Sequence, residues 1–232
     1  GCAMFVANEY GHKIIPPPHV FLGPTYSEKE YIKALALVGI TYKRPDNIFE
    51  EVARLLSEGK IIGFHQGRSE FGPRALGNRS ILADPRSVKM KDEINSRVKF
   101  REEYRPFAPA VIEDEASSVF HMDRPSPYMT TAFRVQDNWK NKLGATTHTN
   151  GTARVQTVSE KSAPEFYKLL KEFYKITGVP VLLNTSFNIK GQPIVETPLE
   201  AISTFSSTGI DALCLGPFLI LKTQTPRGDP IE

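Results

Sequence analysis

Arginine side chains are concentrated in one short stretch of the sequence, and they are the residues most suited to chemistry there. Seven of the thirteen arginines lie between Arg68 and Arg105, several of them beside a glycine or a proline. A guanidinium group presents its donors in a fixed fork that matches the oxygens of a phosphate or a carboxylate. Neighbouring glycines let the backbone approach a ligand closely. The pattern therefore predicts recognition of a small anion.

The net charge of the chain is small, although this stretch is strongly cationic. The 232 residues include 29 Lys and Arg and 26 Asp and Glu, which gives +3 at pH 7. A small total charge with one local concentration of arginine favours a discrete anion pocket over a broad nucleic-acid surface. Acidic residues such as Glu70 and Asp84 lie in the same stretch, so an ordinary surface of ion pairs is the alternative.

The order of residues 67–80 favours the pocket. The segment reads GRSEFGPRALGNRS and is not a Walker A loop, because no Gly-Lys-Ser/Thr follows its glycines. Arg74 is the first candidate for anion contact, because Pro73 and Gly77 predict an exposed turn around it. The other candidate donors of the loop are Arg68, Asn78, Arg79 and Ser80. We expect at least one of the three arginines to pair with Glu70 or Asp84 and only shape the loop.

A second arginine cluster follows at Arg101 and Arg105. Arg105 enters the sequence RPFAP, whose prolines can hold a guanidinium rigidly at the mouth of a cavity. Glu102 is an equally available partner, so a salt bridge is the alternative to ligand contact. Ligand contact is slightly favoured, because the apolar run after Arg105 predicts a strand that would fix its position.

Polar residues also follow an apolar run near the C-terminus. The sequence LLNTSFN, residues 182–188, predicts a buried strand that runs into a polar loop. The loop supplies three candidate donors, which are Asn184, Ser186 and Asn188. An Asx turn that caps the strand is the alternative for Asn184. Lys190 and Glu196 are weaker candidates, for a phosphate and for a ribose or Mg²⁺ respectively.

Alternating helices and strands predict an α/β fold. Helix caps are expected at Asn47, Ser87, Ser162 and Thr197. Strands are expected at residues 61–64, 131–135, 154–158, 179–183, 212–215 and 218–221. Crossover helices together with pairs of consecutive strands predict a twisted mixed sheet with helices packed on it, in a three-layer or two-layer sandwich.

Four segments occur in a fixed order along the chain: GRSEFGPRALGNRSILADPR, FREEYRPFAP, GTARVQTV and LLNTSFNIKGQPIVETP. Together they resemble the C-terminal region of the O-carbamoyltransferase family of nodulation factor, cephamycin and tobramycin biosynthesis, from about Leu22 to Lys222. The resemblance implies a domain similar to the threonylcarbamoyl-adenylate synthase fold. In the longer family members an actin-like N-terminal domain precedes it.

The resemblance also implies a division of the chain. Residues 1–24 are expected to be the remnant of a helix of the N-terminal domain and the interdomain linker, residues 25–224 the carbamoyl-adenylate-forming domain, and residues 225–232 a tail. The sequence contains no apolar stretch of the roughly 20 residues that span a bilayer and no signal-peptide pattern, so we expect a cytoplasmic protein with no membrane partner.

The chemistry implied by the resemblance is adenylation. The domain would form carbamoyl-adenylate from carbamoyl phosphate and ATP with Mg²⁺, and the actin-like domain would transfer the carbamoyl group to an alcohol. We assign Arg74 and Arg105 as catalytic residues. The expected ATP or carbamoyl phosphate contacts are Arg68, Asn78, Arg79, Ser80, Arg101, Thr152, Arg154, Asn184, Ser186 and Asn188.

One segment departs from the family pattern. HTNGTAR resembles the family's His-x-Asp-Gly-Thr-Ala-Arg, but Asn150 replaces the usual acid, which weakens any metal or base role for His148. We find no zinc or iron ligand set, and the metal of the transfer site is expected in the N-terminal domain. Two alternatives remain for the whole chain, an RNA-binding module or a non-catalytic docking module of the same fold. Acceptor selection is expected in the N-terminal domain, so these motifs do not specify the alcohol.

Overall fold

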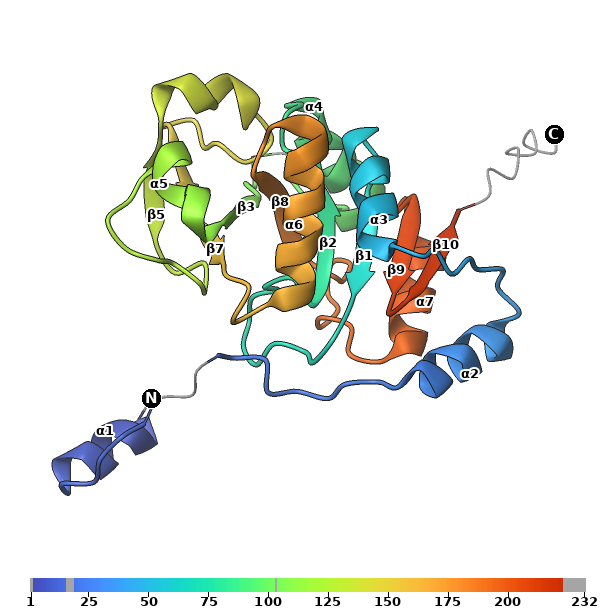
Figure 1. Ribbon diagram of the computed structural model, residues 1–232, viewed down its shortest axis with the longest axis horizontal. Helices are drawn as coiled ribbons and strands as arrows, with labels where there is room; N and C mark the ends of the chain where they lie inside the picture. The colour runs from blue at the N-terminus through green and yellow to red at the C-terminus, as the bar shows by residue number, and fades with distance from the viewer. Residues whose placement is uncertain (1, 16–18, 103, 223–232) are drawn as a thin grey trace.

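A mixed seven-stranded sheet forms the centre of the structure, a computed structural model that describes residues 2–15, 19–102 and 104–222 (Figure 1). The strand order is β10-β9-β1-β2-β8-β3-β7; β1 is parallel to β9 and β3 to β7, whereas the other neighbours are antiparallel. An antiparallel sheet of order β4-β5-β6 lies beside it. The strands are β1 (Ile62–His65), β2 (Arg79–Ala83), β3 (Ala108–Ile112), β4 (Phe120–His121), β5 (Ala132–Val135), β6 (Thr152–Arg154), β7 (Gln156–Val158), β8 (Val181–Ser186), β9 (Ala212–Leu215) and β10 (Phe218–Leu221).

The helices begin and end where local sequence favours it. Asn47 caps α3 by accepting from the backbone amides of Phe49 and Glu50, and Thr197 caps α7 in a capping box with Glu200. The helical segments are α1 (Cys2–Glu9), α2 (Glu28–Val38), α3 (Ile48–Ser57), α4 (Lys89–Ile94), the π-helical η1 (Asn95–Lys99), η2 (Glu113–Glu115), α5 (Ala116–Val119), η3 (Asp137–Lys142), α6 (Pro164–Thr177) and α7 (Pro198–Ser207).

Helices cover both faces of the large sheet. α3 and α6 pack together on one face, and α2, α4 and α7 contribute to a separate core on the other (Figure 1). The pleat of β2 serves both cores, because Leu82 joins the first while Ile81 and Ala83 join the second. The structure thereby confirms the expected twisted mixed sheet with packed helices, in its three-layer form.

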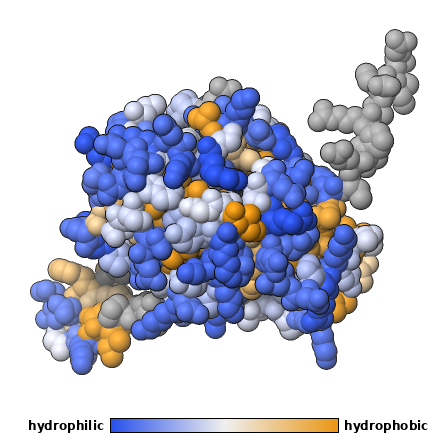
Figure 2. Space-filling view, turned by 45° about the horizontal axis from the view of Figure 1, so that its top comes forward, coloured by the Kyte–Doolittle hydropathy of each residue, from blue (hydrophilic) through white to orange (hydrophobic). Residues whose placement is uncertain are grey.

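The N-terminal segment has two parts in the structure. α1 buries none of its residues, and its exposed apolar side chains include Met4, Phe5 and Val6. Figure 2 shows hydrophobic surface on the part of the molecule that projects at the lower left. The segment from His19 lies against the arginine-rich loop instead. The assignment of residues 1–24 to a helix and a linker stays a prediction, since residues 16–18 lie outside the described ranges, as does the expected tail at 225–232.

Several local predictions were wrong. α6 begins at Pro164 with Ala163 as its N-cap, because proline at the first helical position shifts the start past Ser162. α4 has Val88 rather than Ser87 as its N-cap. The capping box of Ser27 and Glu30, which starts α2, was missed.

The strand boundaries also differ at two places. The expected strand at residues 154–158 is divided between β6 and β7, with Val155 between them. β8 continues through Asn184 to Ser186, because these residues pair with the unpredicted strand β2. Asn184 and Ser186 therefore lie in a sheet, whereas Asn188 follows the strand as expected.

Candidate functional site

The arginine-rich loop connects β1 to β2 and is held by a single carboxylate. Glu70 Oε1 accepts from the backbone amides of Leu76, Asn78 and Arg79 at 2.7, 2.8 and 3.2 Å. The remaining amide of this run, that of Gly77, donates to Ser80 Oγ at 3.0 Å. Four consecutive amides are thus bound by side chains, so the loop has a defined shape and Glu70 is not an ion-pair partner of its arginines.

The fixed loop leads Arg74 into a pocket of about 560 Å³ together with Arg154 from β6. Burial and the positive charge of Arg74 lower the pKa of Arg154. Arg154 Nε is buried without a hydrogen-bond partner within the described ranges. No Asp or Glu is among the described residues that line the pocket. Two guanidinium groups without a carboxylate between them favour an anion as the missing partner.

A buried lysine forms the second part of the site. Lys99, only 4% exposed, ends η1 and donates through Nζ to Ser186 Oγ at 3.2 Å and to Asn188 O and Oδ1 at 3.0 and 2.9 Å. It also donates to Ser186 O. Burial and then the charge of Arg101 lower the pKa of Lys99 to about 7. Its four acceptors are all uncharged oxygens, so the ammonium has no counter-ion among them.

Arg101 joins the two parts of the site electrostatically. Its Nε donates to Asn95 Oδ1 at 2.8 Å, and its guanidinium lies 4.6 Å from the centroid of the Phe107 ring. Burial, followed by the charge of Arg105, lowers its pKa, and Arg154 contributes in the same direction. Arg105 itself is exposed, and its Nη1 lies 3.9 Å from Glu102 Oε2. The structure thus brings Lys99, Arg101, Arg154 and Arg74 near enough for each to act electrostatically on the next, with Ser186 and Asn188 in contact with Lys99. Arg105 also acts on Arg101, but it forms the ion pair with Glu102 that was the alternative to ligand contact.

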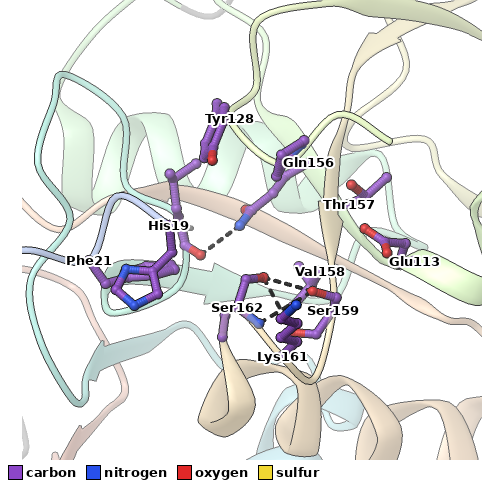
Figure 3. Close-up of a pocket in the computed structure, with 13 residues that line it drawn as sticks. His19, Phe21, Glu113, Tyr128, Gln156, Thr157, Val158, Ser159, Lys161 and Ser162 are labelled. Carbon is purple, nitrogen blue, oxygen red and sulfur yellow. Dashed lines mark hydrogen bonds between the residues drawn. The ribbon is translucent and has the colours of Figure 1, made fainter. Parts of the chain in front are cut away.

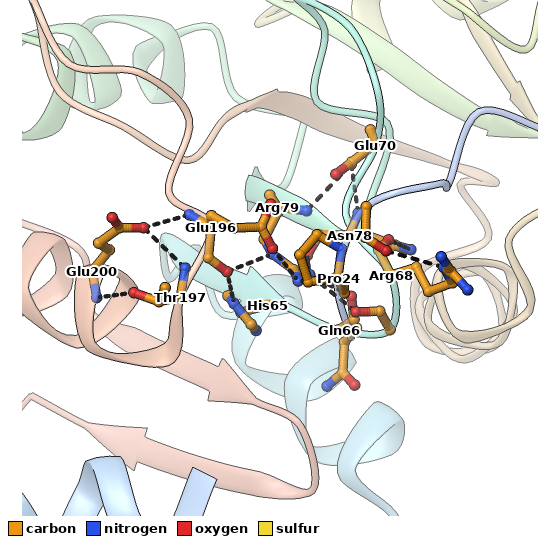
Figure 4. A network of polar contacts seen from close by, with 12 residues as sticks. Pro24, His65, Gln66, Arg68, Glu70, Asn78, Arg79, Glu196, Thr197 and Glu200 are labelled. Atoms are coloured by element: carbon orange, nitrogen blue, oxygen red, sulfur yellow. Dashed lines mark hydrogen bonds and ion pairs between the residues drawn. The ribbon is translucent and has the colours of Figure 1, made fainter. Parts of the chain in front are cut away.

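Arg79, by contrast, is a fully buried part of the scaffold. Its guanidinium donates to the carbonyl oxygens of Gln66, Asn78 and Glu196 at 2.7, 3.0 and 3.2 Å, and pairs with Glu196 Oε1 at 3.3 Å (Figure 4). Weaker contacts reach the carbonyls of Gly67 and Pro24 at 3.3 and 3.5 Å. All its guanidinium nitrogens have protein acceptors, so Arg79 shapes the loop, as expected of one arginine. The expected partner was wrong, because Arg79 pairs with Glu196, whereas Glu70 binds backbone amides and Asp84 pairs with Arg86.

Three other predicted residues of the loop also contact the protein itself. Arg68 donates to the carbonyls of Leu22 and Gly23, both at 3.0 Å, and so ties the N-terminal segment to the loop. Asn78 Nδ2 donates to the carbonyl of Arg68 at 2.7 Å. Ser80 is fully buried and accepts from the backbone as described above. Their predicted ligand contacts stay predictions.

Asn184 lies inside the sheet rather than in a loop. It is 1% exposed and donates to Gln156 Oε1 at 2.8 Å and to the carbonyl of Ala75 at 3.3 Å. Gln156 in turn donates to the carbonyl of Leu76 at 2.6 Å. β7 and β8 are thereby tied to the loop at Arg74, which makes Asn184 a positioning residue for that loop. Its Oδ1 is buried without a partner in the described part of the chain.

The departure at residue 150 has a local structural role. Asn150 Oδ1 accepts from the backbone amide and the hydroxyl of Thr152 at 3.1 and 2.8 Å, which is an Asx turn at the start of β6. Thr152 Oγ1 also lies 3.1 Å from His148 Nδ1. Burial and the charge of Arg154 lower the pKa of His148. Asparagine therefore preserves the turn that presents Arg154.

Lys99 and Glu70 are the residues that our interpretation of the sequence missed. Lysine and glutamate are usually exposed, and a charged residue beside arginines is normally read as an ion-pair partner. The position of Lys99 in the sequence was the signal that could have shown its burial. Lys99 directly follows Val98, which closes the apolar series of Met90 and Ile94, so it falls at the edge of a buried face.

Glu70→Ala should lower the free energy of unfolding by about 1–3 kcal/mol, because three backbone amides lose their acceptor. Glu70→Gln keeps an acceptor without its charge. Its free energy of unfolding should therefore lie between those of Glu70→Ala and the wild type. Glu58→Ala is the control, since Glu58 is exposed and forms a surface ion pair with Arg54, so its removal should cost less than about 1 kcal/mol. Urea unfolding measures all three, and equal effects of the two alanine variants would contradict the role of Glu70.

The class of the protein follows from comparison with known families. The chain matches the family described as "Carbamoyltransferase C-terminus" over residues 53–222. It therefore belongs to the carbamoyltransferase C-terminal family. Among solved structures it is similar to full-length HypF in a phosphate- and nucleotide-bound form, with a TM-score of 0.54 and 20% identity, over 76% of this chain and 26% of that one. At this identity the similarity shows a shared fold.

Curated relatives are longer proteins. The chain is 45% identical over 237 residues to nodulation protein NolO of Bradyrhizobium diazoefficiens, which covers 99% of this chain and 43% of the relative. It is 44% identical over 236 residues to nodulation protein NolNO of Sinorhizobium fredii, with coverages of 98% and 35%. The chain thus spans less than half the length of these relatives.

Other classes of site would need a membrane-spanning helix or a group of metal ligands. No described helix has both the length and the apolar character needed to cross a membrane. Among the same residues, no three His, Cys, Asp or Glu side chains are grouped so that they could hold a metal ion.

Proposed function

We propose that this chain forms carbamoyl-adenylate from ATP and carbamoyl phosphate. The observation that carries the proposal is the group of Arg74, Arg154, Arg101 and Lys99. Burial, followed by neighbouring positive charges, lowers the pKa values of Lys99, Arg101 and Arg154, and no Asp or Glu in the described part of the chain forms an ion pair with any of the four. Such a cluster is costly unless polyanionic ligands complete it. Two phosphate-bearing substrates of a carbamoyltransferase would do so, whereas a purely structural cluster would need acids.

The chemistry requires two displacements. Water first cleaves carbamoyl phosphate to carbamate and phosphate, and a carbamate oxygen then attacks the α-phosphorus of ATP while the bond to pyrophosphate breaks. Negative charge grows on the phosphoryl oxygens during the second step, so fixed cations stabilise it. Lys99 ends η1 and contacts Ser186 at the end of β8. Its N–H donors can pass from the oxygens of Ser186 and Asn188 to a phosphoryl oxygen. Mg²⁺ would enter on the nucleotide phosphates, with no residue of this chain assigned to it.

Transfer to an alcohol is proposed for the rest of a longer polypeptide. This division is motivated by the relatives, of which this chain spans less than half. In this proposal the chain alone releases pyrophosphate slowly but does not carbamoylate an alcohol. Detection of a carbamoylated alcohol with this chain alone would contradict the division.

The proposal is tested by Arg74→Ala. Because Arg74 is exposed at the edge of the pocket, this change should alter the free energy of unfolding by less than about 0.5 kcal/mol. Loss of a charge-assisted phosphate contact should weaken ATP binding by about 1.5–3 kcal/mol. Arg74→Lys keeps the charge but not the fork, so its binding should lie nearer the alanine variant. Calorimetry with Mg·ATP and a melting curve measure the two quantities.

Arg124→Ala is the matched control, because Arg124 is exposed and pairs with Asp123. It should leave both the binding of ATP and the melting temperature unchanged. If the folded wild-type protein binds neither Mg·ATP nor carbamoyl phosphate, alone or together, the proposed function is wrong. If Arg74→Ala melts far lower but binds normally, Arg74 belongs to the scaffold.

A further inference from the structure

An exposed aromatic ring stands beside the two arginines of the pocket. Phe71 is 77% exposed and lines the same pocket as Arg74 and Arg154. Leaving so much aromatic surface in water sacrifices about 25 cal/mol for each Å² of apolar area that could be buried. A single exposed ring is common on protein surfaces, but this one lines a pocket that also holds two guanidinium groups.

The backbone holds this ring in place. The amide of Phe71 donates to the carbonyl of Val20 at 2.7 Å, and Gly72 follows in a conformation with φ of 134° that favours glycine. Glu70 before it is fixed by its three amide contacts. The ring therefore projects from a fixed point of the loop, so little ordering entropy is lost when a ligand packs on it.

A second aromatic residue lines the same pocket, and the residue after it has strained backbone. Tyr128 lines the pocket next to Met129, which is buried and adopts φ of 54°. A residue other than glycine in this region costs about 1–3 kcal/mol and is often found at ligand sites. Phe71 and Tyr128 thus line a pocket that also presents two guanidinium groups.

A neighbouring pocket of about 450 Å³ shares Tyr128 and Leu76 with this one and lacks this combination (Figure 3). Its described lining has one lysine, Lys161, but no arginine, and it includes the carboxylate of Glu113. A carboxylate repels phosphate groups, so this neighbour is the less suitable place for a nucleotide. The pocket of Arg74 pairs an anion site with planar apolar surfaces.

From these observations we infer that Phe71 and Tyr128 bind the base of the nucleotide, while Arg74 and Arg154 hold its phosphates. The inference rests on the proposed function and adds which wall of the site receives the purine. A planar base stacks on aromatic side chains. The strength of this contact depends on the presence of the aromatic ring and not on a charged group. The phosphate chain and the base can therefore be tested separately.

The experiment compares Mg·ATP with Mg·tripolyphosphate, which has the phosphate chain without a base. Phe71→Leu should weaken ATP binding about tenfold and leave tripolyphosphate binding unchanged. Phe71→Tyr keeps the stacking face and should bind ATP like the wild type. Phe5→Leu is the control, because Phe5 is also exposed but lies on α1. Calorimetry with each ligand and variant gives the dissociation constants.

The outcomes separate this inference from the proposed function. If the wild type binds neither ligand, the proposed function fails and the base site fails with it. If the wild type binds both ligands equally, or Phe71→Leu weakens both equally or neither, the phosphate site stands and the base site is wrong. Tighter binding of a short oligoadenylate than of ATP would also overturn the inference and indicate an RNA site.

Discussion

Arg79→Met is expected to lower the free energy of unfolding by about 3–5 kcal/mol, although Arg74 in the same loop can be replaced with little loss of stability. Arg79 is 0% exposed and donates to carbonyl oxygens of three separate segments, at Gln66, Pro24 and Glu196. Methionine fills a similar volume but leaves those acceptors buried and unpaired, at about 1–3 kcal/mol for each that water cannot reach. A chain of this size should then melt about 10 °C lower.

Arg74→Met is the matched control, because Arg74 stands at the exposed apex of the same loop. It should melt within about 2 °C of the wild type. Arg79→Lys should be destabilised almost as much as Arg79→Met, since one ammonium cannot reach acceptors on opposite sides of the guanidinium. A melting temperature of Arg79→Met close to that of Arg74→Met would show that the carbonyls of the loop find other donors.

The fold was largely predictable because its main helices and strands are locally consistent. α3 and α6 each carry an apolar stripe, and the capping box at Thr197 marks the start of α7. β9 and β10 read as apolar runs separated by Gly216. In these elements the local preference and the tertiary environment agree, so the periodicity of the sequence was sufficient.

β2 could not be predicted from local sequence. It begins with Arg79 and Ser80, which are polar residues after a glycine-rich turn and are typical of a loop. They are buried because β2 pairs with β1 and β8, and because carbonyls from distant segments surround the guanidinium. Long-range pairing therefore overrode propensity.

The candidate site was predictable as a composition but not as a geometry. The sequence indicated an anion site and selected Arg74, Arg101 and Arg154, which the structure brings into one electropositive region. It could not show that Arg79 donates all its hydrogen bonds to the protein itself or that Lys99 is buried. Both outcomes depend on contacts across more than 80 positions of sequence, to Glu196 and to Ser186.

Above pH 7, ATP binding to this protein should weaken by about tenfold for each pH unit, because Lys99 must take up a proton to meet a phosphate. Burial and the charge of Arg101 lower the pKa of Lys99 from its ordinary 10.5 to about 7. A bound phosphate supplies the missing counter-ion and raises that pKa again. The prediction rests on the proposed ATP site. Calorimetry between pH 7 and 9, in two buffers with different ionisation enthalpies, measures both the affinity and the proton uptake.

The stability of the ligand-free protein should change with pH in the opposite direction. Between about pH 7 and 10.5 the unfolded chain holds the Lys99 proton and the folded chain has lost it, so the free energy of unfolding rises with pH. The slope approaches about 1.4 kcal/mol per pH unit and should disappear in Lys99→Met. Lys99→Arg stays charged, so its ATP affinity should be independent of pH over this range. If Lys99 were only structural, its replacement would alter stability without changing the pH dependence of ATP binding. Equal pH profiles of ATP affinity for the wild type and Lys99→Arg would therefore contradict a phosphate contact by Lys99.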